Sequence, residues 1–267
     1  MKPAFELNNV SLIHPNGHSA LRDISLHARS GEKIAVIGSS GAGKTSLLNL
    51  LATSVRPSAG AISLLGQDVW QLNKSALRRL RTQIGMIHQQ PPLPAKQRVI
   101  TAVLAGKLGQ WSQARALLSL IYPQDIPGVF HVLQQLEIAD KIFERCDVLS
   151  GGQLQRVGVA RILYQSPSLI LADEPVSAMD PTLSEITISK LHATASQGGV
   201  TFVASLHAVD IALKWFERII GIKSGRIAFD LPVLQVTRAM LSDLYDAESG
   251  AIPLQGITLA DTEPCEP

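Results

Sequence analysis

The sequence predicts an α/β fold whose β-containing core is interrupted by an inserted helical lobe. Short strand-like apolar runs alternate with helical segments on both sides of a central stretch, about residues 90–164, that has mostly helical spacing. Hydrophobic residues make up 46% of the 267 residues and charged residues 17%, which is enough apolar side chain for a sizeable core and argues against disorder.

Two strands with nearly alternating apolar residues open the chain. A turn at Pro15-Asn16-Gly17 separates them. The apolar positions are Phe5, Leu7, Val10 and Leu12 in the first strand, and Ile24, Leu26 and Ala28 in the second.

A buried strand, a glycine-rich loop and a helix follow. Lys33–Gly38 is an apolar run that ends in glycine, as a buried strand does. The helix is expected at Lys44–Ala52 and a further short strand at Ala61–Leu65. From Ser75 onward, apolar residues at helical spacing stand among arginines.

The helical lobe is expected to contain four helices, and strand signals return after it. The helices are Val99–Leu108, Ser112–Leu120, Gly128–Leu136 and Gly152–Tyr164. The later strands are Ser168–Ala172 and Val200–Ser205, followed by a hairpin of Ile219–Ile222 and Arg226–Phe229 around Lys223-Ser224-Gly225.

A phosphate-binding motif lies between the buried strand and its helix. Gly38–Thr45, here called the phosphate loop, fits G-x-x-x-x-G-K-[ST]. Its glycines let successive N–H groups point at one phosphate, and the helix N-terminus attracts the same anion. We expect Lys44 to neutralise the β- and γ-phosphates, Thr45 to hold Mg²⁺, and Ser46 to reach another phosphate oxygen. The loop residues are Gly38, Ser39, Ser40, Gly41, Ala42, Gly43, Lys44 and Thr45.

Two carboxylates follow a second buried strand. Asp173 and Glu174 come directly after Ser168–Ala172, at the strand end where open α/β sheets bind ligands. Asp173 is expected to support Mg²⁺ through a water, and Glu174 to orient or deprotonate the attacking water. An ordinary acidic turn is the alternative, which the phosphate loop upstream disfavours.

A third motif identifies a family. Leu149-Ser150-Gly151-Gly152-Gln153, followed by Gln155, Arg156 and Arg161, resembles the signature of ABC (ATP-binding cassette) ATPases. The resemblance covers about residues 4–240. It implies a P-loop (RecA-like) core with a mixed sheet, an N-terminal antiparallel β-subdomain and an inserted α-helical subdomain, with ATP and Mg²⁺ bound. It also implies a head-to-tail dimer in which Ser150, Gly151, Gly152 and Gln153 of one copy meet the nucleotide of the other.

The resemblance assigns roles to four more residues. Gln89 contacts Mg²⁺ and the water, Asp180 lies at the dimer interface, and His207 reaches the γ-phosphate. The family usually has an aromatic residue, mostly tyrosine, stacked on adenine where this chain has His14, so His14 is expected to touch adenine with less apolar area.

Several segments further resemble the ATP-binding subunits of bacterial phosphonate importers. The resemblance implies import of phosphonate or a related phosphorus oxyanion. Its implied partners are a second copy, membrane permease subunits and, indirectly, a periplasmic substrate-binding protein, and its implied location is the cytoplasmic face of the inner membrane. The segments are Leu77–Ile84, Val103–Gly109, Ser205–Leu213, Glu217–Ile222 and Ser224–Ile227.

Alternative functions remain open at this point. A cassette for amino acids, lipoproteins or another export substrate shares every catalytic motif. A non-transport ABC ATPase acting on DNA or ribosomes usually has coiled coils, zinc inserts or two cassettes, and a simple P-loop kinase or GTPase does not need the signature. The net charge of +2 is too mild to indicate a nucleic-acid binder.

Residues 241–267 are expected to form an acidic, flexible tail after the ATPase domain. No Lys or Arg follows Arg238, while six acidic residues do. The core is expected at about 1–89 and 165–240. The N-terminus shows no signal-peptide pattern, no apolar run is long enough to span a bilayer, and Cys146 and Cys265 are expected to be reduced thiols.

Overall fold

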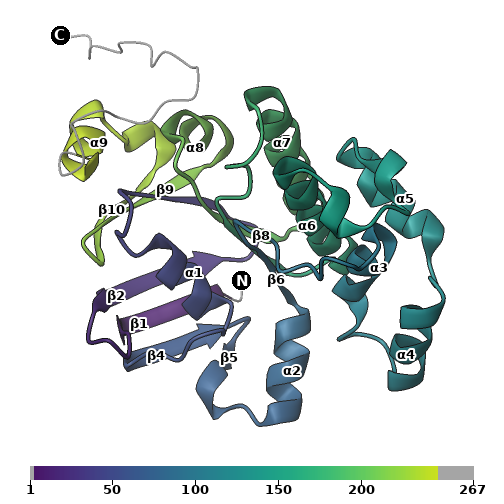
Figure 1. Ribbon diagram of the computed structural model, residues 1–267. Helices are drawn as coiled ribbons and strands as arrows, with labels where there is room; N and C mark the ends of the chain where they lie inside the picture. Colours follow the sequence, from purple (N-terminus) through teal and green to yellow (C-terminus); the bar gives the residue numbers. More distant parts are fainter. Residues whose placement is uncertain (1–2, 246–267) are drawn as a thin grey trace.

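Two β-sheets and a group of helices build the chain, which the computed structural model describes over residues 3–245 (Figure 1). The smaller sheet is antiparallel in the order β2-β1-β4-β5. Its strands are β1 (Pro3–Ile13), β2 (Ser19–Arg29), β4 (Ala59–Leu64) and β5 (Gln67–Asp68). The predicted pair of N-terminal strands is therefore present, and each is longer than its alternating core.

The larger sheet has the order β10-β9-β3-β8-β7-β6. Only the β9–β10 hairpin is antiparallel, so the predicted mixed sheet is confirmed. Its strands are β3 (Lys33–Ile37), β6 (Ile84–Ile87), β7 (Leu169–Asp173), β8 (Thr201–Ser205), β9 (Arg218–Lys223) and β10 (Arg226–Pro232).

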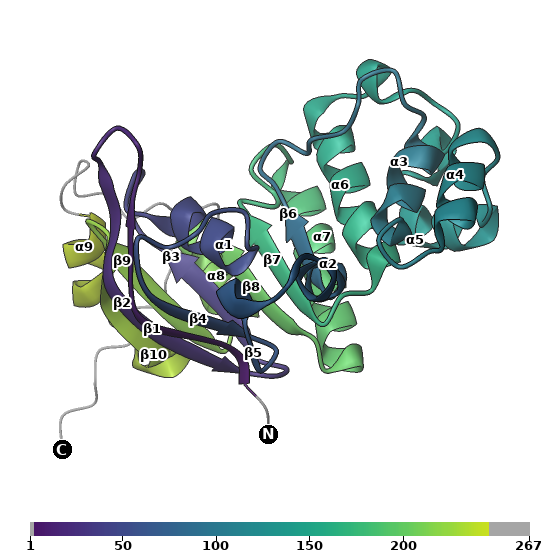
Figure 2. The same ribbon diagram turned by 90° about the horizontal axis from the view of Figure 1, so that it is seen from below.

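Helices cover the larger sheet and form a separate lobe. Figure 2 shows α3, α4 and α5 projecting to one side of the two sheets, beyond α6. The helices are α1 (Lys44–Leu51), α2 (Lys74–Thr82), α3 (Val99–Leu104), α4 (Gln113–Ile121), α5 (Ile126–Gln135), α6 (Gly151–Gln165), α7 (Pro181–Gly198), α8 (Val209–Trp215) and α9 (Arg238–Tyr245). Short 3-10 turns lie at Val69–Gln71, Ala105–Lys107, Ala139–Lys141, Cys146–Val148 and Val233–Gln235.

The two faces of the larger sheet bury separate cores. Alternate residues of β3 point to opposite faces, so Ile34 and Val36 pack with the antiparallel sheet and α1, while Ala35 and Ile37 pack towards the helical lobe. The phosphate loop follows β3 and therefore starts from a strand that is buried on both sides.

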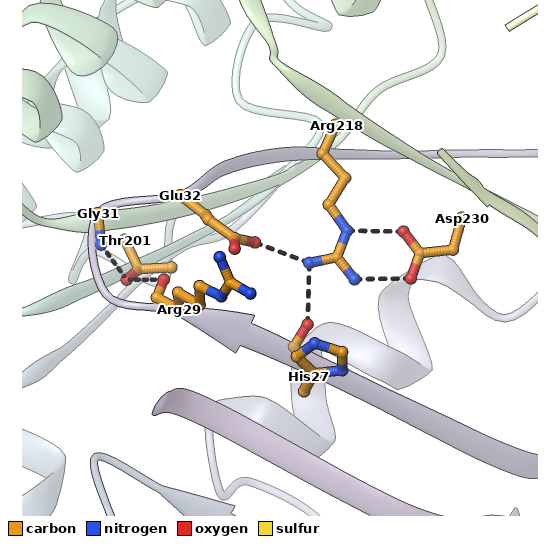
Figure 3. A network of polar contacts seen from close by, with 7 residues as sticks. All are labelled: His27, Arg29, Gly31, Glu32, Thr201, Arg218 and Asp230. Atoms are coloured by element: carbon orange, nitrogen blue, oxygen red, sulfur yellow. Dashed lines mark hydrogen bonds and ion pairs between the residues drawn. The ribbon is translucent and has the colours of Figure 1, made fainter. Parts of the chain in front are cut away.

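Arg218 of β9 joins the two sheets through its hydrogen bonds (Figure 3). Its guanidinium donates to both oxygens of Asp230, each at 2.6 Å, to Glu32 at 2.7 Å and to the carbonyl of His27 in β2 at 3.0 Å. The hydrogen bond to Asp230 raises the pKa of Arg218, against the opposing effect of burial. Thr201 of β8 adds a link, because its hydroxyl accepts from the N–H of Gly31 and donates to the carbonyl of Arg29.

The C-terminal end of the described chain corrects one expectation. Leu241–Tyr245, predicted as the start of a flexible tail, belong to α9. The helix forms because Leu241, Leu244 and Tyr245 have helical spacing and are buried beside β9, which outweighs the acidic character of the segment. Residues 246–267, with Cys265, lie outside the described range, whereas Cys146 is buried and free.

No helix between residues 3 and 245 combines the length and apolarity that crossing a membrane demands.

Candidate functional site

The phosphate loop connects β3 to α1 and depends on glycine at both ends. Gly38 has φ +151° and Gly43 has φ +113°. A Cβ atom at position 38 would lie 2.2 Å from the carbonyl oxygen of Ile222, and one at position 43 would lie 2.7 Å from that of Ala20. Backbone therefore approaches the loop too closely for any side chain at these two positions.

Lys44 lies inside the curve of the loop. Its Nζ donates to the carbonyl oxygens of Gly38 at 2.7 Å and Ser39 at 2.9 Å, and the residue is only 6% exposed. These two hydrogen bonds hold the first part of the loop around a buried positive charge. A phosphate placed in the loop would face this charge and the N-terminus of α1.

Asp173 ends β7 beside the helix that follows the loop. Its Oδ1 accepts from the Thr45 hydroxyl at 3.1 Å and from the Ser205 hydroxyl at 2.6 Å. Ser205, at the end of the neighbouring strand β8, was not predicted from the sequence. The signal that could have found it is the parallel register, which pairs Asp173 directly with Ser205.

Glu174 occupies a strained and well-anchored turn. Its φ is +47°, an uncommon backbone conformation for a residue other than glycine. Its N–H donates to Ser205, its carbonyl accepts from Gln155 Nε2 at 2.8 Å, and its Oε2 accepts from Gln89 Nε2 at 2.8 Å. The structure therefore brings Gln89 and Glu174 together, 85 residues apart in sequence.

These groups surround one pocket of about 410 Å³. Residues 40–46, Gln89 and Glu174 are among its lining residues, and the β1–β2 hairpin contributes His14 and His18. The two imidazole rings are stacked, with centroids 6.3 Å apart and an angle of 6° between the ring planes. His18 was missed in the sequence because a histidine near a turn carries no distinguishing pattern.

The signature lies at the N-terminus of α6, and none of its residues lines this pocket. Ser150 and Gln153 form a reciprocal capping box: the N–H of Gln153 donates to Ser150 Oγ at 3.3 Å, and the N–H of Ser150 donates to Gln153 Oε1 at 2.9 Å. Ser150 and Gly151 are exposed, while Gly152 packs against the backbone of Ala178.

Two other predicted residues also lie away from this pocket. Asp180 is exposed and caps α7, accepting from the N–H of Leu183 at 3.1 Å. His207 is exposed just after β8. Gln155, by contrast, connects the signature helix to the acidic turn, because its amide donates to Glu174 and accepts from Ala178.

A second cavity of about 170 Å³ lies between the end of β6 and α6. His88, Pro91 and Arg161 are among its lining residues. Burial lowers the pKa of His88, Asp173 acts in the opposite direction, and Arg161 lowers it further. The neutral form of His88 is therefore favoured next to Gln89.

The side-chain oxygens of Thr45 and Asp173 fit a hard divalent cation that takes most of its ligands from substrate and water. Thr45 and Asp173 offer a hydroxyl and a carboxylate side by side, and oxygen is the ligand that Mg²⁺ prefers. Across residues 3–245, no group of three or more His, Cys, Asp or Glu side chains could hold a metal alone. A cation at Thr45 and Asp173 would thus depend on substrate phosphates and water.

The chain is similar to known proteins of one family. Residues 21–177 match the ABC transporter family. The phosphonates import ATP-binding protein PhnC 1 of Cupriavidus necator is 58% identical over 253 residues, covering 95% of this chain and 90% of the relative. The PhnC 1 protein of Pseudomonas aeruginosa is 56% identical and covers 92% of each chain.

Solved structures resemble the fold at lower identity. The dimeric ATP-binding cassette MJ0796, in a post-hydrolysis state with ADP and Pi, superposes with a TM-score of 0.73 at 26% identity. That similarity covers 86% of this chain and 98% of MJ0796.

Proposed function

The chain belongs to the ABC transporter family, and we propose that it is the ATP-binding and ATP-hydrolysing subunit of a phosphonate importer. The observation that supports ATP hydrolysis is the single pocket that unites the phosphate loop, the Gln89–Glu174 pair and the neighbouring Asp173. The import of phosphonates is supported by the similarity of nearly the whole chain to phosphonates import ATP-binding proteins.

Binding of the triphosphate uses the loop and its lysine. The N–H groups of residues 41–46 and the positive end of α1 surround the phosphates, and Lys44 exchanges part of its contact with loop carbonyls for phosphate oxygens. His14 and His18 line the same pocket, and the base would contact them. Imidazole rings offer a flat surface for adenine, though a smaller one than tyrosine.

Mg²⁺ would be held by Thr45, Asp173 and Gln89 together with phosphate oxygens, and when bound it neutralises charge on the β- and γ-phosphates. The protein side of this site is already ordered. The hydroxyls of Ser205 and Thr45 both donate to Asp173 Oδ1, at 2.6 and 3.1 Å, and so orient this carboxylate.

Glu174 is placed to accept the proton of the attacking water. The water oxygen forms a bond to the γ-phosphorus, the bond from that phosphorus to the bridging oxygen breaks, and ADP and phosphate are released. Gln89 lies 2.8 Å from the carboxylate and can orient the same water. The backbone contacts at the N–H and carbonyl of Glu174 keep the side chain aimed at the pocket.

The remaining machinery comes from a second copy. Ser150, Gly151, Gly152 and Gln153 of one chain would meet the γ-phosphate in the pocket of the other, with Asp180 at the interface. His207 would also reach the γ-phosphate. Closure of this dimer would move the helical subdomain, about residues 90–164, against the permease subunits at the cytoplasmic face of the inner membrane. A periplasmic binding protein would deliver the phosphonate to the opposite side.

Replacing Glu174 with glutamine tests the hydrolytic assignment. Glu174→Gln keeps the size and the contact with Gln89 but removes the base, so we expect turnover to fall about 10²- to 10⁴-fold with ATP affinity unchanged. Turnover and ATP binding are measured on the same preparation. Normal turnover in the variant would remove Glu174 from the catalytic role.

A pull-down from detergent-solubilised membranes tests the transport assignment. We expect the tagged chain to recover a permease and a periplasmic binding protein, identified by mass spectrometry. Calorimetry on that binding protein should then show alkylphosphonates binding more tightly than amino acids. Recovery of only ribosomal or DNA-associated proteins, or a binding protein selective for amino acids, would contradict phosphonate import.

A further inference from the structure

The C-terminal part of the chain holds the phosphate loop at both of its ends. At the first end, the N–H of Gly38 donates to the hydroxyl oxygen of Tyr245 at 3.2 Å. At the other end, the N–H of Gly225 donates to the carbonyl of Ala42 at 2.9 Å. Both contacts come from a segment nearly 200 residues away in sequence, and the mechanism above uses neither.

Tyr245 is a buried contact rather than a surface one. It is 2% exposed, and the hydrogen bond to Gly38 is itself buried. A buried backbone N–H without a partner is costly. The tyrosine hydroxyl satisfies this N–H at the point where the backbone leaves the sheet.

Gly38 is fixed on each side by a different residue. Tyr245 holds the peptide unit before it, and Lys44 holds the carbonyl after it at 2.7 Å. The carbonyl of Ile222 in β9 leaves no room for a Cβ at this position. Rotation of either peptide unit would redirect the N–H groups that follow, so the position of Gly38 determines the direction of the anion-binding groups.

The helix that carries Tyr245 is attached to the same strand. Lys223, next to Ile222, contacts both the carbonyl and the carboxylate of Asp243, the latter at 2.9 Å. Leu241 and Leu244 are buried on the inner side of α9. Figures 1 and 2 both show α9 beside β9, so strand, helix and loop start form one connected body.

We propose that Tyr245 is a positioning residue for the phosphate loop and that α9 thereby sets nucleotide affinity. This inference rests on the proposed ATPase function. A purely structural role for Tyr245 would lower stability without changing the affinity of the folded protein for ATP. A positioning role changes the dissociation constant of ATP and leaves turnover at saturating ATP intact, because the hydroxyl acts at Gly38 whereas the chemistry is assigned to Glu174 and Gln89.

The test compares two tyrosine-to-phenylalanine variants. Tyr245→Phe removes only the hydroxyl at the loop, and Tyr164→Phe removes a hydroxyl that bonds Asp125 at 2.9 Å in the helical subdomain. The dissociation constant for ATP, the kcat, the Tm without nucleotide and the amide exchange of the peptide around Gly38 are measured for both. A lost hydrogen bond of ordinary strength predicts about 2- to 12-fold weaker ATP binding for Tyr245→Phe, with kcat unchanged.

The outcomes separate the two hypotheses. Weaker ATP binding and faster exchange at Gly38 in Tyr245→Phe, with neither change in Tyr164→Phe, support positioning. Unchanged ATP affinity in Tyr245→Phe, or an equal loss of affinity in both variants, would overturn it. Failure of the wild-type chain to bind ATP would instead refute the proposed function, before any variant is compared.

Discussion

The phosphate loop and the signature are two glycine- and serine-containing turns at helix N-termini, but the contacts that hold them differ. The phosphate loop is anchored within the chain: Lys44 is buried, Glu174 and Gln89 line the same pocket, and the C-terminal segment holds the loop at Gly38 and Ala42. The signature is exposed at Ser150 and Gly151, and its cap is satisfied within its own helix by Gln153.

The difference teaches which half of a phosphate site a single chain can complete. A loop anchored around a buried lysine is prepared for an anion from solution. A turn whose serine already caps its own helix gains a phosphate only when another surface brings one. Gln155 connects the two regions within the chain, because it joins the signature helix to the backbone of Glu174.

The largest expected effect on turnover comes from placing the phosphate-loop defect and the signature defect in different chains. Lys44→Ala and Ser150→Ala are each expected to lower turnover at least about 10²-fold, since each removes a group that we propose stabilises charge on the γ-phosphate. Mixing the two inactive variants should restore about a quarter of wild-type turnover, because half of the randomly formed dimers are mixed and each has one complete site. Steady-state ATPase assays on mixtures of varied ratio measure this.

The control mixes Lys44→Ala with Glu174→Gln. A mixture of Lys44→Ala and Glu174→Gln leaves both defects in phosphate-loop halves, so no complete site can form and activity should stay low. Recovery in this mixture, or no recovery in the first one, would contradict a site shared between two copies.

The helix cap and the phosphate contact of Ser150 can also be separated. Aspartate is a good N-cap, so Ser150→Asp should keep the Tm near that of the wild type while its charge repels the γ-phosphate and lowers turnover about 10²-fold. The matched control is Ser112→Ala, which removes the corresponding cap of α4. It should lower the free energy of unfolding by about 1 kcal/mol with turnover unchanged. Calorimetry and ATPase assays measure the two quantities, and full activity in Ser150→Asp would limit Ser150 to capping.

The sequence predicted the parts of this site that depend on local pattern. Gly38–Thr45 and Asp173-Glu174 could be located because each motif follows an apolar strand, and the structure places both at strand ends of one sheet. Ser205, His18 and Tyr245 could not, because their roles arise from which strands and turns are neighbours in space. The contact of Tyr245 with Gly38 joins residues 207 positions apart, and an acidic composition concealed the apolar face of α9.

The smallest expected effect concerns the part of the pocket where we propose that adenine binds. His14→Tyr enlarges the aromatic surface facing adenine and should tighten ATP binding about 2- to 10-fold, whereas His14→Ala should weaken it to a similar extent. Tripolyphosphate, which lacks a base, is the matched ligand, and its affinity should be the same in all three proteins. Calorimetric titration of both ligands compares them. If the affinity for tripolyphosphate shifted as much as that for ATP, His14 would act by moving the hairpin and the phosphate loop together. The pocket would then have to be treated as one unit from the base to the γ-phosphate.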